Sequence, residues 1–269
     1  CNLISRNKRY TWVSFGCKYP FYLKGGTRKP LNGNRDRMRG TYLGPEYAEP
    51  DVREMLVQRE AVFHRLEDQT LCQQVADYLS NEMVVGWFQG RMEFGPRALG
   101  NRSIIGDARS VRMQRMLNMK IKYRESFRPF APAVLQEQVS QYFDLERDSP
   151  YMLLVDFVKS NRRRVATAEE RELKGIDRLN VVRSDIPSVT HVDYSARSQT
   201  VHDDTNPRFY ALLKHFYQQT ECGVLVNTSF NVRGEPMVCS PEDAYRCFMA
   251  TEMDVLVIGY LVLYKSEQV

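Results

Sequence analysis

The sequence predicts an α/β fold, or an α+β fold with a mixed sheet, and two observations lead to this class. Short apolar strands alternate with amphipathic helices, most clearly over the last third of the chain. The chain has 269 residues, of which 43% are hydrophobic and 26% charged, so it can bury an ordinary core and is neither disordered nor fibrous in composition. Its longest apolar stretch, Val255–Tyr264, covers about half of the roughly twenty residues that a membrane helix needs. The sequence therefore predicts no membrane span.

The first two thirds of the chain contain five predicted regular elements. Residues 1–41 are dense in Gly, Asn, Arg and aromatic side chains, and we expect an irregular basic segment with one short strand near Tyr10–Phe15. Apolar residues at helical spacing, and then in short continuous runs, define the elements beyond residue 41. These are a helix over 71–83, a buried strand over 84–88, a Gly- and Pro-rich loop over 90–100, a helix over 111–121 and a strand over 130–135.

The last third carries the clearest local signals. Asn206 and Pro207 are typical of a helix cap and a first helical position, and Ser240 is a cap for a second helix. The expected elements are a strand over 187–192, a helix over 207–217, a buried strand over 223–226, a helix from 241 to about 249, and strands over 255–258 and 261–264.

Residues 159–183 interrupt this pattern. They hold eight Lys or Arg and four acidic residues, with few apolar side chains. We expect a solvated loop or helix here, and a polyanion contact or a mobile lid is the alternative.

Positive charge is concentrated in two segments. The net charge is +5, but residues 1–40 carry +9 and residues 91–128 carry +7, which leaves −11 for the remainder. Such a distribution favours a polyanionic partner, such as a nucleotide, a nucleic acid or a phosphorylated metabolite. A solvated basic surface explains the charge equally well.

The six cysteines form no CxxC pair. No signal peptide precedes them, so we expect reduced thiols in a cytoplasmic protein, without a disulfide framework or a zinc knuckle. The chain begins with Cys1 rather than Met, which indicates part of a longer protein.

The densest candidate site is the loop that follows the strand over 84–88. Its sequence, GRMEFGPRALGNRS, places Arg91, Arg97 and Arg102 among glycines that let backbone N–H groups approach an anion. The glycine spacing matches neither a P-loop nor a dinucleotide-binding fingerprint. The alternative is a structural loop whose arginines pair with the acidic remainder of the chain.

A second basic motif, KIKYRESFRPF, begins at Lys120. Lys122 and Arg124, two positions apart, would point the same way from an extended segment as two prongs of one anion site, and Arg128 follows them. Basic residues interleaved with rings also suit single-stranded RNA. Aromatic side chains that pack inward explain the same pattern.

Small polar residues follow the short apolar strand over 223–226. Open α/β sheets bind ligands at the carboxyl ends of strands, so Asn227, Thr228, Ser229 and Asn231 are candidate ligand contacts, and Ser229 and Asn231 would share a face. A structural turn is the alternative.

Two further side-chain groups are weaker candidates. His191 and Asp193 are too few for a metal site, and a hydrogen-bonded structural histidine is expected, so no metal ligand is predicted. Arg197 is a separate basic candidate just past them.

Taken together, these motifs resemble the carboxy-terminal half of the O-carbamoyltransferases that act on nodulation factors, cephem antibiotics and aminoglycosides. The matching segments are GRMEFGPRALGNRS, IKYRESFRPFAP, HVDYSARSQTV and NTSFNVRGEP, in the family's order, within residues 42–265. The resemblance implies that residues 42–269 form a YrdC-like domain, a twisted mixed sheet flanked by helices. YrdC-like domains carry a Lys-x-Arg and a Ser-x-Asn motif, to which Lys122–Arg124 and Ser229–Asn231 correspond.

The chemistry that the resemblance implies has two stages. The YrdC-like half forms carbamoyl-adenylate from ATP, with its Mg²⁺, and carbamoyl phosphate. An amino-terminal half, which is absent from these residues, transfers the carbamoyl group to a hydroxyl with a bound metal. Residues 1–41 do not look like the segment that joins the two halves, and we expect a remnant of a linker or of the missing domain there.

The resemblance also implies roles for the candidate residues. Lys122, Arg124, Arg128, Arg197 and Ser229 are the expected catalytic group. The expected nucleotide contacts are Arg91, Arg97, Arg102, Asn227, Thr228 and Asn231. Two other functions stay open, a YrdC-like RNA-binding module and an inactive fragment without its transfer domain; a homodimer also remains open.

Overall fold

The computed structural model describes residues 38–179 and 181–268. The strand expected near Tyr10–Phe15 and all but the last four residues of the segment over 1–41 therefore lie outside the described residues. An eight-stranded mixed sheet runs through the molecule in the order β1-β10-β9-β2-β3-β8-β4-β7. Only the β2–β9 and β4–β7 pairs are parallel. The predicted mixed α/β class is thus confirmed.

The strands of this sheet are short, and most are fully buried. They span His64–Arg65 (β1), Val85–Phe88 (β2), Arg102–Asp107 (β3), Ala131–Leu135 (β4), Gln199–Val201 (β7), Val224–Ser229 (β8), Val255–Ile258 (β9) and Leu261–Tyr264 (β10). The strands expected over 84–88, 130–135, 223–226, 255–258 and 261–264 are therefore confirmed, with β8 three residues longer at its carboxyl end than predicted. A separate two-stranded sheet joins β5 (Asp156–Phe157) and β6 (Ser195–Ala196).

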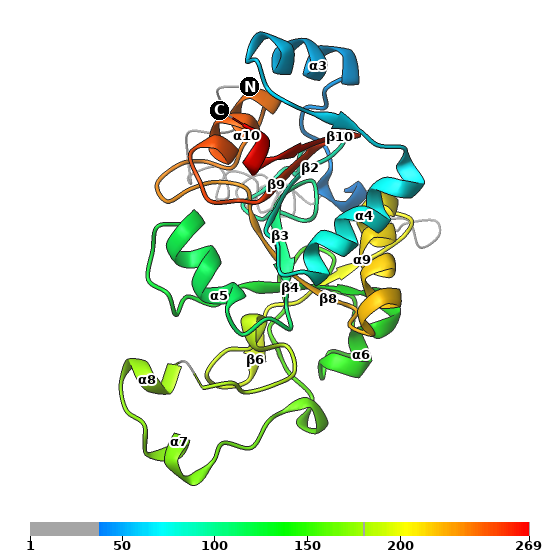
Figure 1. Ribbon diagram of the computed structural model, residues 1–269. Helices are drawn as coiled ribbons and strands as arrows, with labels where there is room; N and C mark the ends of the chain where they lie inside the picture. Colours follow the sequence, from blue (N-terminus) through cyan, green and yellow to red (C-terminus); the bar gives the residue numbers. More distant parts are fainter. Residues whose placement is uncertain (1–37, 180, 269) are drawn as a thin grey trace, which may run out of the picture.

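Helices cover the two faces of the main sheet (Figure 1). On one side α4 (Asp68–Ser80) and α9 (Pro207–Thr220) pack against each other. On the other side lie α5 (Met113–Met116) and α10 (Pro241–Met249), and α3 (Glu49–Gln58) packs against α10. The predicted caps are confirmed, because Asn206 accepts the Phe209 N–H and Ser240 forms a reciprocal pair with Asp243.

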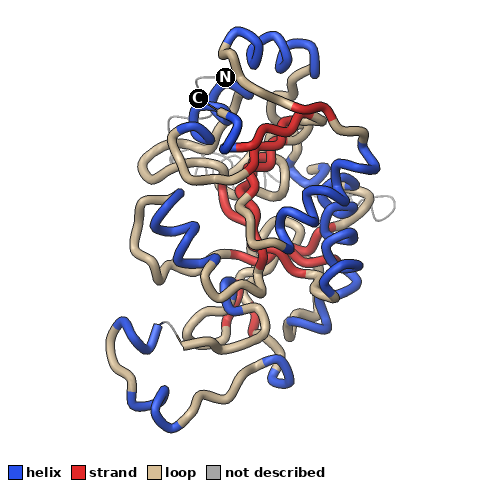
Figure 2. Tube along the Cα trace, in the orientation of Figure 1, coloured by secondary structure: helices blue, strands red, loops and turns tan. Residues whose placement is uncertain are grey.

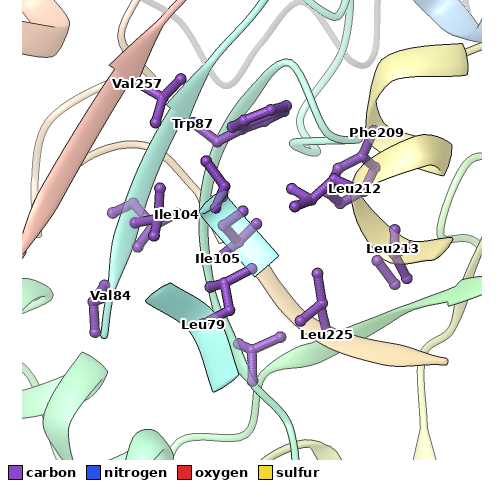
Figure 3. Close-up of a cluster of buried hydrophobic side chains, with 14 of the residues drawn as sticks. Leu79, Val84, Trp87, Ile104, Ile105, Phe209, Leu212, Leu213, Leu225 and Val257 are labelled. Carbon is purple, nitrogen blue, oxygen red and sulfur yellow. The ribbon is translucent and has the colours of Figure 1, made fainter. Parts of the chain in front are cut away.

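The core lies on both faces of the sheet, and Figure 3 shows the part of it that includes side chains of α4 and α9. Side chains from four strands meet those of the two helices there, and all the labelled residues are buried. They include Trp87 of β2, Ile104 and Ile105 of β3, Leu225 of β8, Leu79 of α4 and Phe209 of α9. This packing fixes the strand ends that carry the candidate site.

The segment over 143–198 has mostly loops and short turns (Figure 2). It follows α6 (Val139–Tyr142) and contains two exposed short helices, α7 (Ala168–Glu172) and α8 (Ile176–Leu179). The expectation of a solvated segment over 159–183 agrees with this arrangement.

Two sequence expectations need correction, and one strand was missed. Pro187–Val189 is a turn of 3-10 helix rather than part of a strand, since Pro187 offers no N–H to a ladder and the Ser188 hydroxyl bonds to the Ser110 carbonyl. The helix expected over 111–121 is α5 followed by a turn of π-helix, Leu117–Ile121. The central strand β3 was not predicted at all.

Candidate functional site

Three of the four predicted small polar residues, Asn227, Thr228 and Ser229, lie at the carboxyl end of β8 and line a cavity of about 160 Å³. Five segments that are separated in the sequence contribute to its walls. Its charged lining residues in the described part of the chain are three arginines, Arg97, Arg124 and Arg197, and no Asp or Glu lines it there. The remaining lining residues are Pro96, Ala98, Pro129, Phe130, Ala131, Met152, Asn227, Thr228 and Ser229.

The end of β8 is held in place from both sides. Ser229 pairs with Ser103 of β3 and Asn227 pairs with Ala131 of β4, both antiparallel. Beyond the strand, the Ser229 hydroxyl donates to Asn231 Oδ1 at 2.7 Å. Ser229 and Asn231, which the sequence places on one face, therefore interact directly with each other, and of the two only Ser229 lines the cavity.

A buried carboxylate shapes the arginine-bearing loop over 90–100. Glu93 is 1% exposed, and its Oε1 accepts the backbone N–H groups of Leu99 at 2.7 Å, Asn101 at 2.7 Å and Arg102 at 3.2 Å. These bonds close the loop around its tip, where Arg97 is exposed and lines the cavity. Glu93 lies inside the quoted motif, but sequence reasoning did not select it.

Arg102 requires a correction, because the structure removes it from the set of ligand contacts. Its side chain is fully buried, and its guanidinium donates to the carbonyls of Gln89, Gly90, Asn101 and Pro45 at 2.6–3.1 Å. It also stacks on the Phe88 ring, 3.5 Å from the centroid. Burial lowers its pKa to about 10, and with no exposed surface it supports the loop from inside.

Lys122 lies behind the cavity wall rather than in the cavity. Its ammonium donates to the carbonyl of Ser229, to the carbonyl of Asn231 at 2.8 Å and to Asn231 Oδ1 at 2.9 Å. Burial lowers its pKa to about 7, while the three acceptors favour the ammonium form. Lys122 therefore fastens the turn that follows β8.

The segment of Lys122 and Arg124 is not extended, which corrects the expected arrangement of two parallel prongs. Tyr123 has a φ of 47°, so the chain turns between the two basic residues. As a result Lys122 faces the interior, whereas Arg124 lines the cavity over the Phe130 ring, 4.9 Å from its centroid.

Arg197 supplies the third positive charge from the link between β6 and β7. Its Nε is buried and has no hydrogen-bond partner. Burial lowers its pKa, and the like charge of Arg97 lowers it further. The negative charge of an anionic ligand would complement these converging guanidinium groups, and its oxygen could accept a hydrogen bond from the unpaired donor.

Two predicted arginines lie outside the cavity lining. Arg91 is exposed, donates to the Gly44 carbonyl at 3.2 Å and lies 3.7 Å from Glu46. Arg128 is exposed and pairs with Glu125 at 3.2 Å.

Other candidate groups have local explanations. His191 Nδ1 lies 3.2 Å from the Ser195 hydroxyl, which donates to Asp193 at 2.7 Å, so the predicted structural histidine is confirmed. A larger open groove of about 1350 Å³ is lined in part by His191 and Asp193, but by none of the residues predicted to act on or bind the substrates. Over the described ranges, no group of three or more His, Cys, Asp or Glu side chains could hold a metal, and no helix is long and apolar enough to cross a membrane.

The fold and the cavity define a mixed α/β domain with an arginine-lined cavity at a strand end. The chain belongs to the carbamoyltransferase C-terminus family, whose model matches residues 76–265.

The relatives are considerably longer than this chain. The uncharacterized Synechocystis protein sll1178 is 57% identical over 90% of this chain, and nodulation protein NolO of Bradyrhizobium diazoefficiens is 37% identical over 86% of it. The chain covers 39% of the length of each. The 3′-hydroxymethylcephem-O-carbamoyltransferase of Streptomyces clavuligerus is 39% identical over 65% of this chain and 29% of that protein.

Among solved structures, full-length HypF in its phosphate- and nucleotide-bound form is a distant match. The TM-score is 0.44 with 16% identity, over 77% of this chain and 23% of that one.

Proposed function

We propose that this carbamoyltransferase C-terminal domain forms carbamoyl-adenylate from ATP and carbamoyl phosphate. In this proposal it is the activating part of an O-carbamoyltransferase that carbamoylates a hydroxyl of a small molecule or glycan. The observation that carries the proposal is the convergence of Arg97, Arg124 and Arg197 on one cavity whose described lining contains no carboxylate. A site of this kind stabilises negative charge that develops on phosphate oxygens.

The proposed reaction balances in two steps. Water cleaves carbamoyl phosphate to carbamate and inorganic phosphate. A carbamate oxygen then bonds to the α-phosphorus of Mg·ATP, the bond between that phosphorus and the bridging oxygen breaks, and pyrophosphate leaves. No covalent protein nucleophile is needed, so catalysis depends on positioning and on charge.

The dimensions of the cavity suggest which part of the substrates it takes. At about 160 Å³ it is smaller than the roughly 300–1,000 Å³ of pockets that enclose a whole drug-sized ligand. We therefore assign it the reacting phosphate and carbamate groups, with the adenine outside it. Thr228 would donate to their oxygens. Ser229 and Asn227 already donate to Asn231, to the Ala98 carbonyl and to Gln199, so they shape the cavity, whereas Lys122 and Asn231 hold the turn and Arg128 lies beyond the cavity lining.

Transfer to the acceptor is assigned to another part of the protein. The chain spans about two fifths of its first two relatives, and we propose that an amino-terminal metal-binding domain, in the same chain or a partner chain, carries out transfer. A cytoplasmic location belongs to the proposal, and the four described cysteines, Cys72, Cys222, Cys239 and Cys247, are all free thiols.

The test is a product assay on the purified chain. ATP, magnesium and carbamoyl phosphate are mixed with it, and pyrophosphate and carbamoyl-AMP are measured with and without carbamoyl phosphate. We expect both products only in its presence, with an Arg197→Ala variant inactive. An Arg147→Ala variant is the matched control, since Arg147 is an exposed arginine outside the cavity lining.

Other outcomes would identify the alternatives. ATP binding without product would contradict autonomous adenylation and indicate a domain that needs the missing half. RNA binding that falls steeply with salt and ignores carbamoyl phosphate would support the RNA-binding alternative.

A further inference from the structure

A fully buried amide holds the turn that carries Arg124. Asn118 lies in the π-helical turn and is 0% exposed. Its Nδ2 donates to the carbonyls of Ser126 at 2.9 Å and Arg128 at 2.8 Å. Both partners of Nδ2 are acceptors, so the orientation of the amide is determined, and Oδ1 is the atom directed at Arg124.

The contact with Arg124 is short and specific. Arg124 Nε donates to Asn118 Oδ1 at 2.6 Å, and the Arg124 backbone N–H donates to the Asn118 carbonyl at 2.9 Å. Over the described residues, neither Nη group of Arg124 has a protein acceptor. The Nε is therefore used for orientation, and the two Nη groups remain for a ligand, which is the arrangement that grips a phosphate with two parallel bonds.

This arrangement leaves Arg124 without an ion-pair partner among the described residues. Within the described part of the chain, no carboxylate lies within ion-pair distance of its guanidinium. Nearby Arg128, in contrast, is paired with Glu125 at 3.2 Å. A carboxylate at position 118 could orient Arg124 equally well, but it would offset the positive charge of the guanidinium. An amide oxygen orients the guanidinium and leaves its charge unchanged.

We propose that Asn118 is a positioning residue that directs the Nη groups of Arg124 at an anionic ligand of the cavity and preserves their full charge. The inference rests on the proposed function for the identity of that ligand. The proposal requires a neutral hydrogen-bond acceptor at position 118, and a charged acceptor there should not replace it.

The experiment is a double-mutant cycle on the full chain, with inorganic pyrophosphate as the probe and calorimetric titration as the readout. We expect about tenfold weaker binding in Asn118→Ala, on the scale of one lost hydrogen bond, and about a hundredfold in Arg124→Ala. The double variant should bind no more weakly than Arg124→Ala, because Asn118 does not line the cavity and in this proposal reaches the ligand through that guanidinium. An equal loss from Asn118→Ala in both backgrounds would show a general structural role and overturn the proposal.

A second variant tests the charge and keeps the test valid if Asn118→Ala does not fold. Asn118→Asp retains an oxygen beside Arg124, and we expect it to weaken pyrophosphate binding at least tenfold. Binding equal to that of the unsubstituted chain would overturn the proposal. Asn161→Ala, at an exposed asparagine on the turn Ser160–Arg162, is the matched control and should bind normally.

The probe separates this inference from the proposed function. If pyrophosphate binding follows the expected cycle but no carbamoyl-AMP forms, the positioning role stands and the adenylation proposal fails. If the unsubstituted chain does not bind pyrophosphate, the positioning role falls together with the anion cavity.

Discussion

Two walls of the cavity each present an arginine, and they are built in opposite ways. The loop over 90–100 carries Arg97 and is closed by the Glu93 carboxylate, which accepts three backbone N–H groups. The turn over 118–130 carries Arg124 and is held by the neutral Asn118 amide. Glu93 and Asn118, the two anchors, are both buried, and each makes three side-chain hydrogen bonds. Only Asn118 bonds to the side chain of the cavity arginine that its wall carries.

The difference shows how a site can be rigid without losing its charge. The negative charge of Glu93 faces the loop backbone and raises the pKa of buried Arg102 against the larger lowering by burial, so these two charges offset each other inside the loop. Asn118 contacts a cavity arginine and carries no charge. Neither anchor therefore neutralises the positive charge that the cavity offers to an anion.

The largest expected effect comes from removing the charged anchor. Glu93→Ala leaves three N–H groups without their acceptor, and we expect a loss of about 3–5 kcal/mol in the free energy of unfolding. Glu93→Gln keeps one acceptor oxygen and should lose about 1–2 kcal/mol. Urea unfolding measures both. Equal losses would show that the charge of Glu93, rather than its hydrogen bonds, holds the loop.

The second prediction compares the two arginines themselves. Arg124 is half-buried and oriented, whereas Arg97 is exposed at a loop tip. We expect Arg124→Ala to lower the rate of carbamoyl-AMP formation by about 10²–10³-fold, the scale for a preorganised donor, and Arg97→Ala by about tenfold. Pyrophosphate release measures both rates. A larger effect at Arg97 would reverse the ranking of the two walls.

Sequence reasoning predicts the elements whose signals are local. Helices with caps at Asn206 and Ser240 and continuous apolar strands such as β9 were predicted for this reason. Strand β3 was missed, since Gly106 and polar residues at both ends hide it, and only its pairing with β2 and β8 makes it a strand. The strand expected over 187–192 was wrong for a related reason, because a burial pattern does not specify a partner.

Within the site, the sequence predicted residue types better than residue positions. Small polar residues at the end of β8 were found because strand-end chemistry is a general rule. Arg97 and Arg102 looked alike in the sequence, yet one is exposed in the cavity and the other is buried, which only tertiary packing decides. Glu93 and Asn118 were missed because they act on neighbouring backbone groups, and no motif spacing marks that role.

The third prediction concerns Lys122, which fastens the end of β8 behind both walls. Its folded pKa of about 7 lies below the value of about 10.4 in an unfolded chain, so between these values the unfolded state binds a proton that the folded state does not. Stability should therefore rise with pH through this window. The limit is about 1.4 kcal/mol per pH unit, and because three oxygen acceptors favour the ammonium, we expect about 1–2 kcal/mol between pH 7.5 and 9. Urea unfolding of the chain and of Lys122→Met across this range gives the difference, and parallel curves would contradict the assignment.

The smallest expected effect sharpens the comparison within a single loop. Arg91 and Arg97 are both exposed arginines of the loop over 90–100, but only Arg97 lines the cavity. Arg91 lies 3.7 Å from Glu46, and exposed pairs of this kind contribute little. We expect Arg91→Ala to change the free energy of unfolding by less than about 0.5 kcal/mol and carbamoyl-AMP formation by less than about twofold. A tenfold fall in that rate would mean that the anion site extends along the whole loop, and the cavity would then be one end of a longer binding surface that includes Arg91.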